Sequence, residues 1–212
     1  IGEHSMAISS LNRFTVPLST DQSASTQGLL MPKMKYRFRA IFENFGVSSE
    51  KVELTKQVAT IARPSVNFEP ITIDVYNSKV RLLGKPTWQD VTIKLRDDAG
   101  GNVSKLVGEQ IQKQFDFAEQ ASASAGIDYK FVLKFEMLDG GNGANAANVL
   151  ETWELYGAFI NNVAYGDMDY SSNDPATIEL TIRFDNAIQS PIGTGIGSSV
   201  GRTLGENITG VT

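Results

Sequence analysis

The stretch most like a chemical site is acidic and runs from Asp167 to Asn173. Its alternate positions carry side-chain oxygen atoms, which is the ligand arrangement of a calcium-binding loop. That loop also needs Gly at its sixth position and Glu at its twelfth, and these positions are Ser172 and Ile178 here. We therefore interpret the stretch as a solvated turn with Asx-type hydrogen bonds, and we expect no metal site.

A glycine-rich segment at 193–203 is the second candidate, because such loops can hold phosphate groups. Its glycine spacing fits no dinucleotide-binding loop. The nucleotide-binding pattern fails by one residue, and Arg202 stands where that pattern has lysine. No helical pattern follows the segment, so we interpret it as a flexible tail and expect no cofactor.

Side chains for catalysis are scarce. Cysteine is absent and His4 is the only histidine, which excludes the usual hydrolase triads and thiolate zinc sites. Adjacent acids such as Asp97 and Asp98 can transfer protons in principle, but acids in a turn are more often solvated. We expect no catalytic residue and no enzymatic activity.

Composition and charge narrow the class of protein. The 212 residues, of which 41% are hydrophobic, suit one domain with one core. The 19 basic and 24 acidic residues give a formal charge of -5, which argues against a nucleic-acid-binding surface. The same charge suits a conduit that DNA passes without adhering, because like charges repel. No apolar run approaches the ~18 residues of a membrane span.

Changes in composition divide the chain into four segments. Residues 1–5 have the character of a remnant of a cleaved expression tag, with Met6 as the native start. Residues 6–31 are polar and predict an N-terminal arm. Residues 32–189 carry the patterns of a folded domain, and residues 190–212 form a Gly/Ser-rich tail.

Alternation of apolar and polar residues predicts the strands of the domain. The predicted strands are 33–40, 51–62, 88–96, 129–137, 149–156 and 177–184. Residues 67–79 contain strand-forming side chains, but Pro70 is unsuited to a central strand and Asn77-Ser78 reads as a turn. We expect an irregular, extended excursion there.

The first predicted strand carries a basic stripe on one face. Its cations are Lys33, Lys35, Arg37 and Arg39. One interpretation is a contact with another subunit or with a sheath protein, whose acids would meet the cations. The other is a solvated strand face, paired across the sheet with Glu residues. Both remain open at this point.

One helix is predicted from Val103 to Ala121, with Asn102 as its N-cap. The residues at helical spacing are Val103, Leu106, Val107, Gln110, Ile111, Gln114, Phe115 and Ala118. Strands dominate and do not alternate with helices, so the class is α+β and mostly β. We expect an antiparallel β-sandwich or barrel with one flanking helix.

Several pieces, in their order around the one helix, resemble a known family. The pieces are 31–39, 62–65 continuing to 75–80, 84–93, and 169–174 followed by 178–185. Together they are similar to the tail tube proteins of contractile-tailed bacteriophages, the myophages. The similarity covers about residues 31–188 and departs in the 139–148 loop, the N-terminal arm and the C-terminal tail.

The resemblance implies a structural virion protein, a tail tube subunit. Family members form hexameric rings with a continuous inner β-barrel, and the rings stack into a conduit for DNA ejection inside a contractile sheath. Implied partners are further copies of the chain, a sheath protein, a tape-measure protein, a baseplate initiator, a tail terminator, and genomic DNA that passes without specific binding. The implied location is the virion tail, assembled in the host bacterial cytoplasm.

The resemblance also implies that the long loop at 66–86 reaches the neighbouring ring. The candidate stacking residues are Phe68, Glu69, Ile71, Asp74, Tyr76, Asn77, Lys79 and Arg81. Alternatives within the same architecture are the tube of a type VI secretion or bacteriocin-like injection system, and a baseplate tube initiator. A different class, a monomeric β-sandwich binding module, would need exposed aromatic residues. Trp88 and Trp153 lie in strand patterns, which favours core packing for both.

Overall fold

The computed structural model describes residues 33–47, 51–54, 56–140, 147–190 and 196–197. The chain divides into two compact units, Ile1–Tyr36 and Arg37–Thr212. Only residues 33–36 of the first unit are described, and they contain a turn and no strand. The predicted tag remnant, the arm and nearly all of the tail lie outside the described residues, so the domain limits at 32 and 189 stay predictions.

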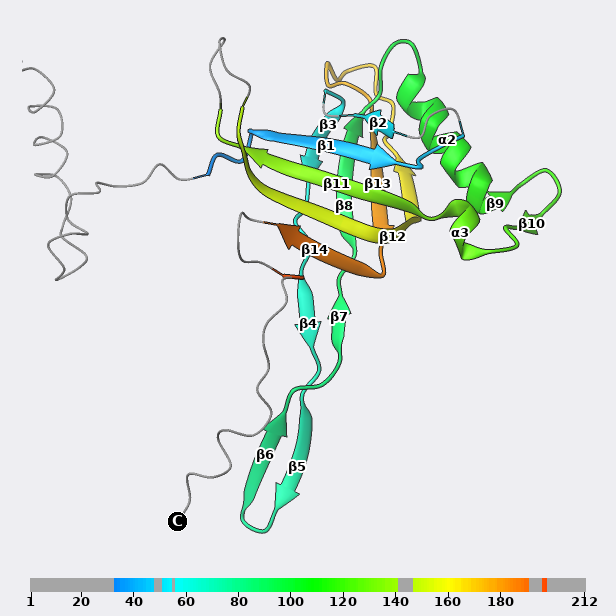
Figure 1. Cartoon of the computed structure of the whole chain (residues 1–212). Helices are drawn as coiled ribbons and strands as arrows, with labels where there is room; N and C mark the ends of the chain where they lie inside the picture. Colours follow the sequence, from blue (N-terminus) through cyan, green and yellow to red (C-terminus); the bar gives the residue numbers. More distant parts are fainter. Residues whose placement is uncertain (1–32, 48–50, 55, 141–146, 191–195, 198–212) are drawn as a thin grey trace, which may run out of the picture. The chain divides into compact units, whose positions relative to one another are not determined.

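An antiparallel sheet forms the body of the second unit (Figure 1). Its hydrogen-bonded order is β2-β1-β11-β12-β13-β8-β3, and β14 also pairs with β12. The strands are β1 (Phe38–Glu43), β2 (Lys51–Glu53), β3 (Val58–Ile61), β8 (Val91–Arg96), β11 (Phe131–Leu138), β12 (Val149–Tyr165), β13 (Thr177–Arg183) and β14 (Asn186–Ser190). The predicted mostly-β, antiparallel class is confirmed.

Strand β12 is the element that turns this sheet into two layers. Its first part pairs with β11 on one edge and β14 on the other, and its last part pairs with β13. Gly157 lies between these parts with a φ of 65°, a conformation that favours glycine. We call the strands around the first part, β2, β1, β11 and β14, the first layer. Strands β13, β8 and β3 around the last part form the second layer.

The core contains the alternate side chains of both layers. In β8 the inward residues are Val91, Ile93 and Leu95, and all three are fully buried. They belong to the same buried cluster as Phe42 and Leu133 of the first layer. A sheet with one wet face produces this period of two, which is why the alternation in the sequence located these strands.

Aromatic rings fill the ends of the core. Phe45 lies 4.9 Å from Phe42, centroid to centroid. Trp153 is buried in the cluster, and Trp88 packs against it with its ring 5.6 Å from that of Phe184. The prediction that both tryptophans serve core packing is confirmed, with Trp153 buried and Trp88 partly buried.

Helix α2 (Asn102–Gln114) packs against the core through Val103 and Val107. The prediction of its C-terminus at residue 121 was wrong, because the chain turns at Phe115 into a small hairpin, β9 (Phe115–Asp116) and β10 (Ala121–Ser122). A second, four-residue helix follows, α3 (Gly126–Tyr129), so the prediction of one helix was incomplete.

The predicted N-cap of α2 was also wrong, because Gly101 holds the cap position and Asn102 is the first helical residue. The capping acceptor comes from further upstream. The Asp98 carboxylate accepts the Asn102 backbone N–H at 2.7 Å and the Asn102 side-chain amide at 2.7 Å. These hydrogen bonds, above all that from the side chain, lower the pKa of Asp98.

Two predicted strands were placed wrongly. Strand β1 begins at Phe38, opposite Met137 near the end of β11, so Lys33 and Lys35 lie outside it. The predicted strand 51–62 is two strands, β2 and β3, which lie at opposite ends of the sheet order.

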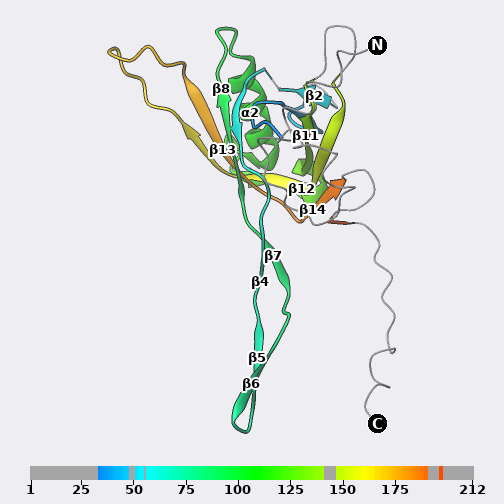
Figure 2. The same ribbon diagram turned by 90° about the vertical axis from the view of Figure 1, so that its left-hand side faces the viewer.

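The excursion predicted as irregular is in fact a regular antiparallel hairpin in two segments. Strand β4 (Val66–Phe68) pairs with β7 (Pro86–Trp88), and β5 (Ile71–Val75) pairs with β6 (Ser78–Leu82). Pro70 lies between β4 and β5, where no ladder hydrogen bond is required of it. Both views show the hairpin extending away from the sheet (Figures 1 and 2).

Candidate functional site

The far segment of the hairpin, β5 and β6, has one apolar face. Its register sets Ile71 opposite Leu82 and Ile73 opposite Val80, with Val75 at the end of the same row. These five side chains are between 45% and 55% exposed, so nothing in the described residues covers this face. An apolar face on a two-stranded hairpin is a surface that gains stability when another molecule covers it.

The opposite face of the hairpin is charged. Thr72 stands opposite Arg81, and Asp74 stands opposite Lys79 with an ion pair of 3.3 Å. Such an exposed pair contributes little to stability, about 0–1 kcal/mol. The two faces therefore differ sharply in character, and only one of them is suited to burial.

The tip of the hairpin is a two-residue turn formed by Tyr76 and Asn77, between the paired residues Val75 and Ser78. Tyr76 has a φ of 41°, in the left-handed region that tight hairpin turns require. Its side chain is fully exposed. The tip therefore presents an aromatic ring beside the apolar face.

The base of the hairpin is joined firmly to the core. Val66 pairs with Trp88, whose ring packs on Phe184. Between the two segments of the hairpin, Gly84 lies so close to the Glu69 carbonyl that a side chain at position 84 would collide with that backbone. The hairpin is therefore held at its base while its far segment reaches into solvent.

All eight residues predicted for the stacking loop lie on this hairpin, but the structure separates them. Only Ile71 belongs to the apolar face, whereas Asp74, Lys79 and Arg81 lie on the charged face. The other residues of the apolar face, Ile73, Val75, Val80 and Leu82, were missed. The alternation on both sides of Tyr76-Asn77 is the sequence signal that would have found them.

The second exposed cluster lies at the other end of the second layer. The loop 166–176 joins β12 to β13, and Thr177 pairs with Arg96 there, whereas the hairpin joins at the Ile61 and Val91 end. Its exposed large side chains are Tyr165, Met168 and Tyr170. The acids of this end are Asp97, Asp98, Asp167, Asp169 and Asp174.

The calcium-like pattern in that loop forms a local turn. The Asp169 carboxylate accepts the Ser171 backbone N–H at 2.9 Å and its hydroxyl at 2.8 Å, and the backbone bond is the main cause of the lowered pKa of Asp169. Among the described residues, no group of three His, Cys, Asp or Glu side chains could hold a metal ion. In the same part of the chain, no helix is long and apolar enough to cross a membrane.

The predicted basic stripe is dispersed. Lys33 and Lys35 are exposed and lie in the first unit, and Arg37 precedes β1. Arg39 stands opposite Glu136 of β11 and donates to its carboxylate. The cross-strand pairing with Glu that one interpretation expects is present, but Glu136 is buried and not solvated. A role of the four cations in subunit or sheath contact stays a prediction.

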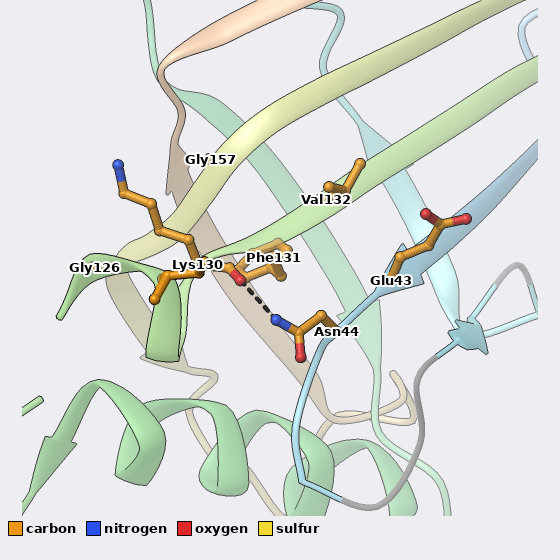
Figure 3. A pocket seen from close by; sticks show the side chains of 8 residues that line it. Glu43, Asn44, Gly126, Lys130, Phe131, Val132 and Gly157 are labelled. Carbon is orange, nitrogen blue, oxygen red and sulfur yellow. Dashed lines mark hydrogen bonds between the residues drawn. The ribbon is translucent and has the colours of Figure 1, made fainter.

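An open hollow of about 560 Å³ lies where β1 and β11 meet α3 (Figure 3). Asn44 donates from its side chain to the Lys130 carbonyl at 3.0 Å on one side of it. The Lys130 ammonium pairs with Asp185 at 2.6 Å. Each of these side chains therefore has a polar partner, and the described residues that line the hollow include no convergent set of groups for catalysis.

The chain is similar in fold to solved structures that include chains of contractile injection systems. A chain of the 6-fold symmetrised anti-feeding prophage baseplate is 13% identical with a TM-score of 0.60, over 78% of this chain and 100% of that one. A chain of the tube-terminating cap of that prophage is 18% identical with a TM-score of 0.59, over 83% and 99%.

A chain of the PVC sheath-tube complex, an extracellular contractile injection system in its extended state, is 18% identical with a TM-score of 0.53. The match covers 82% of this chain and 100% of that one. The fold is that of contractile injection system tube and cap proteins. The resemblance drawn from the sequence is confirmed at the level of fold. No family model matches the chain. No curated protein matches it either.

Proposed function

We propose that this chain is a structural subunit of the inner tube of a contractile phage tail or a related injection system. The observation that carries the proposal is the apolar face of the β5–β6 hairpin on a chain with this fold. Full burial of a large aliphatic side chain contributes about 1.5–3 kcal/mol, so covering five half-exposed ones contributes on the order of 5 kcal/mol per contact. An exposed apolar face marks a surface that a partner covers, and in a polymer the next copy of the chain is that partner.

The partner of the hairpin is the far end of the next copy. The hairpin and the loop 166–176 lie at opposite ends of the second layer, so joining them repeats in one direction. Such a head-to-tail contact is heterologous and produces a filament or stacked rings. The hairpin carries three cations, Lys79, Arg81 and Lys85, and two acids, Glu69 and Asp74, whereas the loop end carries five aspartates. The excess charges of the two ends therefore have opposite signs.

The finer assignment follows the resemblance. Six copies form each ring with a continuous inner β-barrel, and the rings stack inside a sheath as the conduit for DNA in a virion tail. Sheath, tape-measure, baseplate initiator and tail terminator proteins are its partners, and assembly takes place in the host cytoplasm. The anti-feeding prophage and PVC structures equally support the tube of an extracellular contractile injection system.

The test compares two neighbouring residues of β5 that point to opposite faces. We expect Ile73→Asp to abolish tubes or stacked rings in negative-stain electron microscopy, because it places a charge in the buried contact. Thr72→Asp introduces the same charge on the other face and should leave assembly intact. Both residues lie outside the core, so circular dichroism should show the same fold for both.

A third variant, Tyr170→Asp, tests the receiving end. Loss of assembly in this variant and in Ile73→Asp supports the head-to-tail contact. Retained assembly in Tyr170→Asp places the receiving surface elsewhere on the neighbouring copy. Assembly that persists in Ile73→Asp refutes the contact through the apolar face and leaves the tube in place. Wild-type protein that stays monomeric at every concentration and with baseplate added refutes the tube assignment in favour of a monomeric binding module.

A further inference from the structure

The last part of β12 has one edge without a strand neighbour. From Phe159 to Tyr165 it pairs with β13 on one side only. On the other side, pairing with β11 stops at Phe131 opposite Ala158, because the preceding residues form α3 (Figure 1). Among the described residues, no strand continues along this edge. A free edge of that length is a template for a strand of another chain.

A glutamine side chain occupies the first open position on this edge. Gln114, the last residue of α2, donates its side-chain N–H to the Ile160 carbonyl at 2.9 Å. Its side-chain carbonyl accepts the Ile160 backbone N–H, also at 2.9 Å. A primary amide has the same donor and acceptor as a peptide group, so this pair of bonds reproduces what a neighbouring strand would make.

The position of the glutamine bears on its role. Helix α2 is already fixed to the core by Val103 and Val107, so anchoring the helix does not require Gln114. Directly after Ile160, the ladder to β13 is irregular, with a register shift before Asn162. Irregularities of this kind also discourage edge pairing. The Gln114 amide and the register shift, which both oppose the addition of a strand, therefore lie next to each other at Ile160.

We propose that Gln114 is an edge guard, whose amide fills the strand-pairing site of Ile160 and keeps a strand of a second copy of this chain from extending β12. The inference is independent of the proposed function, because it rests on the edge and the two hydrogen bonds alone. It requires that removing the amide expose this edge while the fold persists.

The test uses Gln114→Leu, which removes both bonds, and Gln114→Glu, which adds a charge that repels an incoming strand. Gln112→Leu is the matched control, an exposed glutamine of the same helix whose amide bonds to Asp116. All three are made in the Ile73→Asp background, so that stacking through the hairpin cannot mask a new association. The readouts are hydrogen exchange of the Ile160 amide and sedimentation velocity over a concentration series.

We expect the Ile160 amide of the Gln114→Leu protein to exchange about tenfold faster in dilute solution, as loss of a hydrogen bond predicts. We also expect this variant alone to form larger species as concentration rises. If Gln114→Glu associated with itself to the same degree as Gln114→Leu, the proposal would be overturned. Destabilisation of the fold would then explain the association of both variants. A Gln114→Leu protein that sediments like its parent would also overturn it.

Discussion

Replacing Gln110 by leucine removes a buried glutamine that joins three elements. Gln110 is fully buried on the inner face of α2. Its side-chain carbonyl accepts the Gly46 N–H at 3.0 Å, just after β1, and its amide donates to the Tyr129 carbonyl of α3 at 2.7 Å. Leucine has nearly the same volume and no polar group, so Gln110→Leu isolates the loss of these two bonds.

The magnitude follows from the two groups left without a partner. A buried orphan N–H such as that of Gly46 costs about 1–3 kcal/mol, and the Tyr129 carbonyl, which is only partly buried, about 1 kcal/mol. The greater apolar burial of leucine offsets about 1 kcal/mol. We expect a net loss of about 2 kcal/mol, or a melting temperature lower by roughly 4–8 °C for a chain of this size.

The assay is denaturant unfolding followed by circular dichroism, in the Ile73→Asp background so that assembly does not contribute. Gln112→Leu is the control, because it is the same substitution on the same helix at an exposed position whose amide has no buried partner. The variant should lower the midpoint without changing the slope. If the free energy of unfolding of Gln110→Leu lay within about 0.5 kcal/mol of that of the control, the reasoning would be refuted. The two hydrogen bonds would then make no net contribution to stability.

Two more predictions test the turn geometry and a carboxylate. Gly157→Ala should destabilise the fold by about 1–2 kcal/mol through its positive φ alone. The loss should be larger still, because the new methyl group collides with the Asp185 carboxylate. Adding Asp185→Ala should recover part of the lost free energy of unfolding in denaturation experiments. The pKa of Asp98 is lowered in the folded state by its hydrogen bonds to Asn102. These bonds therefore stabilise the fold at a pH above the usual pKa of aspartate, and the stabilisation is lost as pH falls through the lowered value. The acid-induced fall in melting temperature should be smaller in Asp98→Ala than in the wild-type protein.

The sequence predicted the strands that have one wet face and one buried face. In β13 the buried residues Ile178, Leu180 and Ile182 alternate with polar ones, and the pattern was clear. Strand β12 was predicted only to residue 156, directly before Gly157. A glycine at positive φ bends the strand there, and the pairing continues with β13 on one side.

The limits of prediction at the helix have a different cause. Helical spacing continues through Phe115, but Phe115 and Phe117 pack on each other, rings 5.1 Å apart, in the small hairpin that follows. Gln110 and Gln114 were assigned to the packing stripe by their spacing alone. Their spacing placed them on the inner face, but their partners, Gly46 and Ile160, are distant in sequence and could not be read from it.

The chain covers some of its open backbone groups and leaves one apolar surface uncovered. Gln110 and Gln114 form hydrogen bonds with open backbone groups, whereas the apolar face of the β5–β6 hairpin stays exposed. A subunit that polymerises must leave its assembly surfaces uncovered and must close its other adhesive edges, or growth would branch into aggregates. On this chain one uncovered surface is the apolar face around Ile73, while the open edge at Ile160 is filled by a side chain from its own helix. Any β protein benefits from a closed edge, but the uncovered apolar face requires a partner, and a further copy of the chain joined head-to-tail is the partner that we propose.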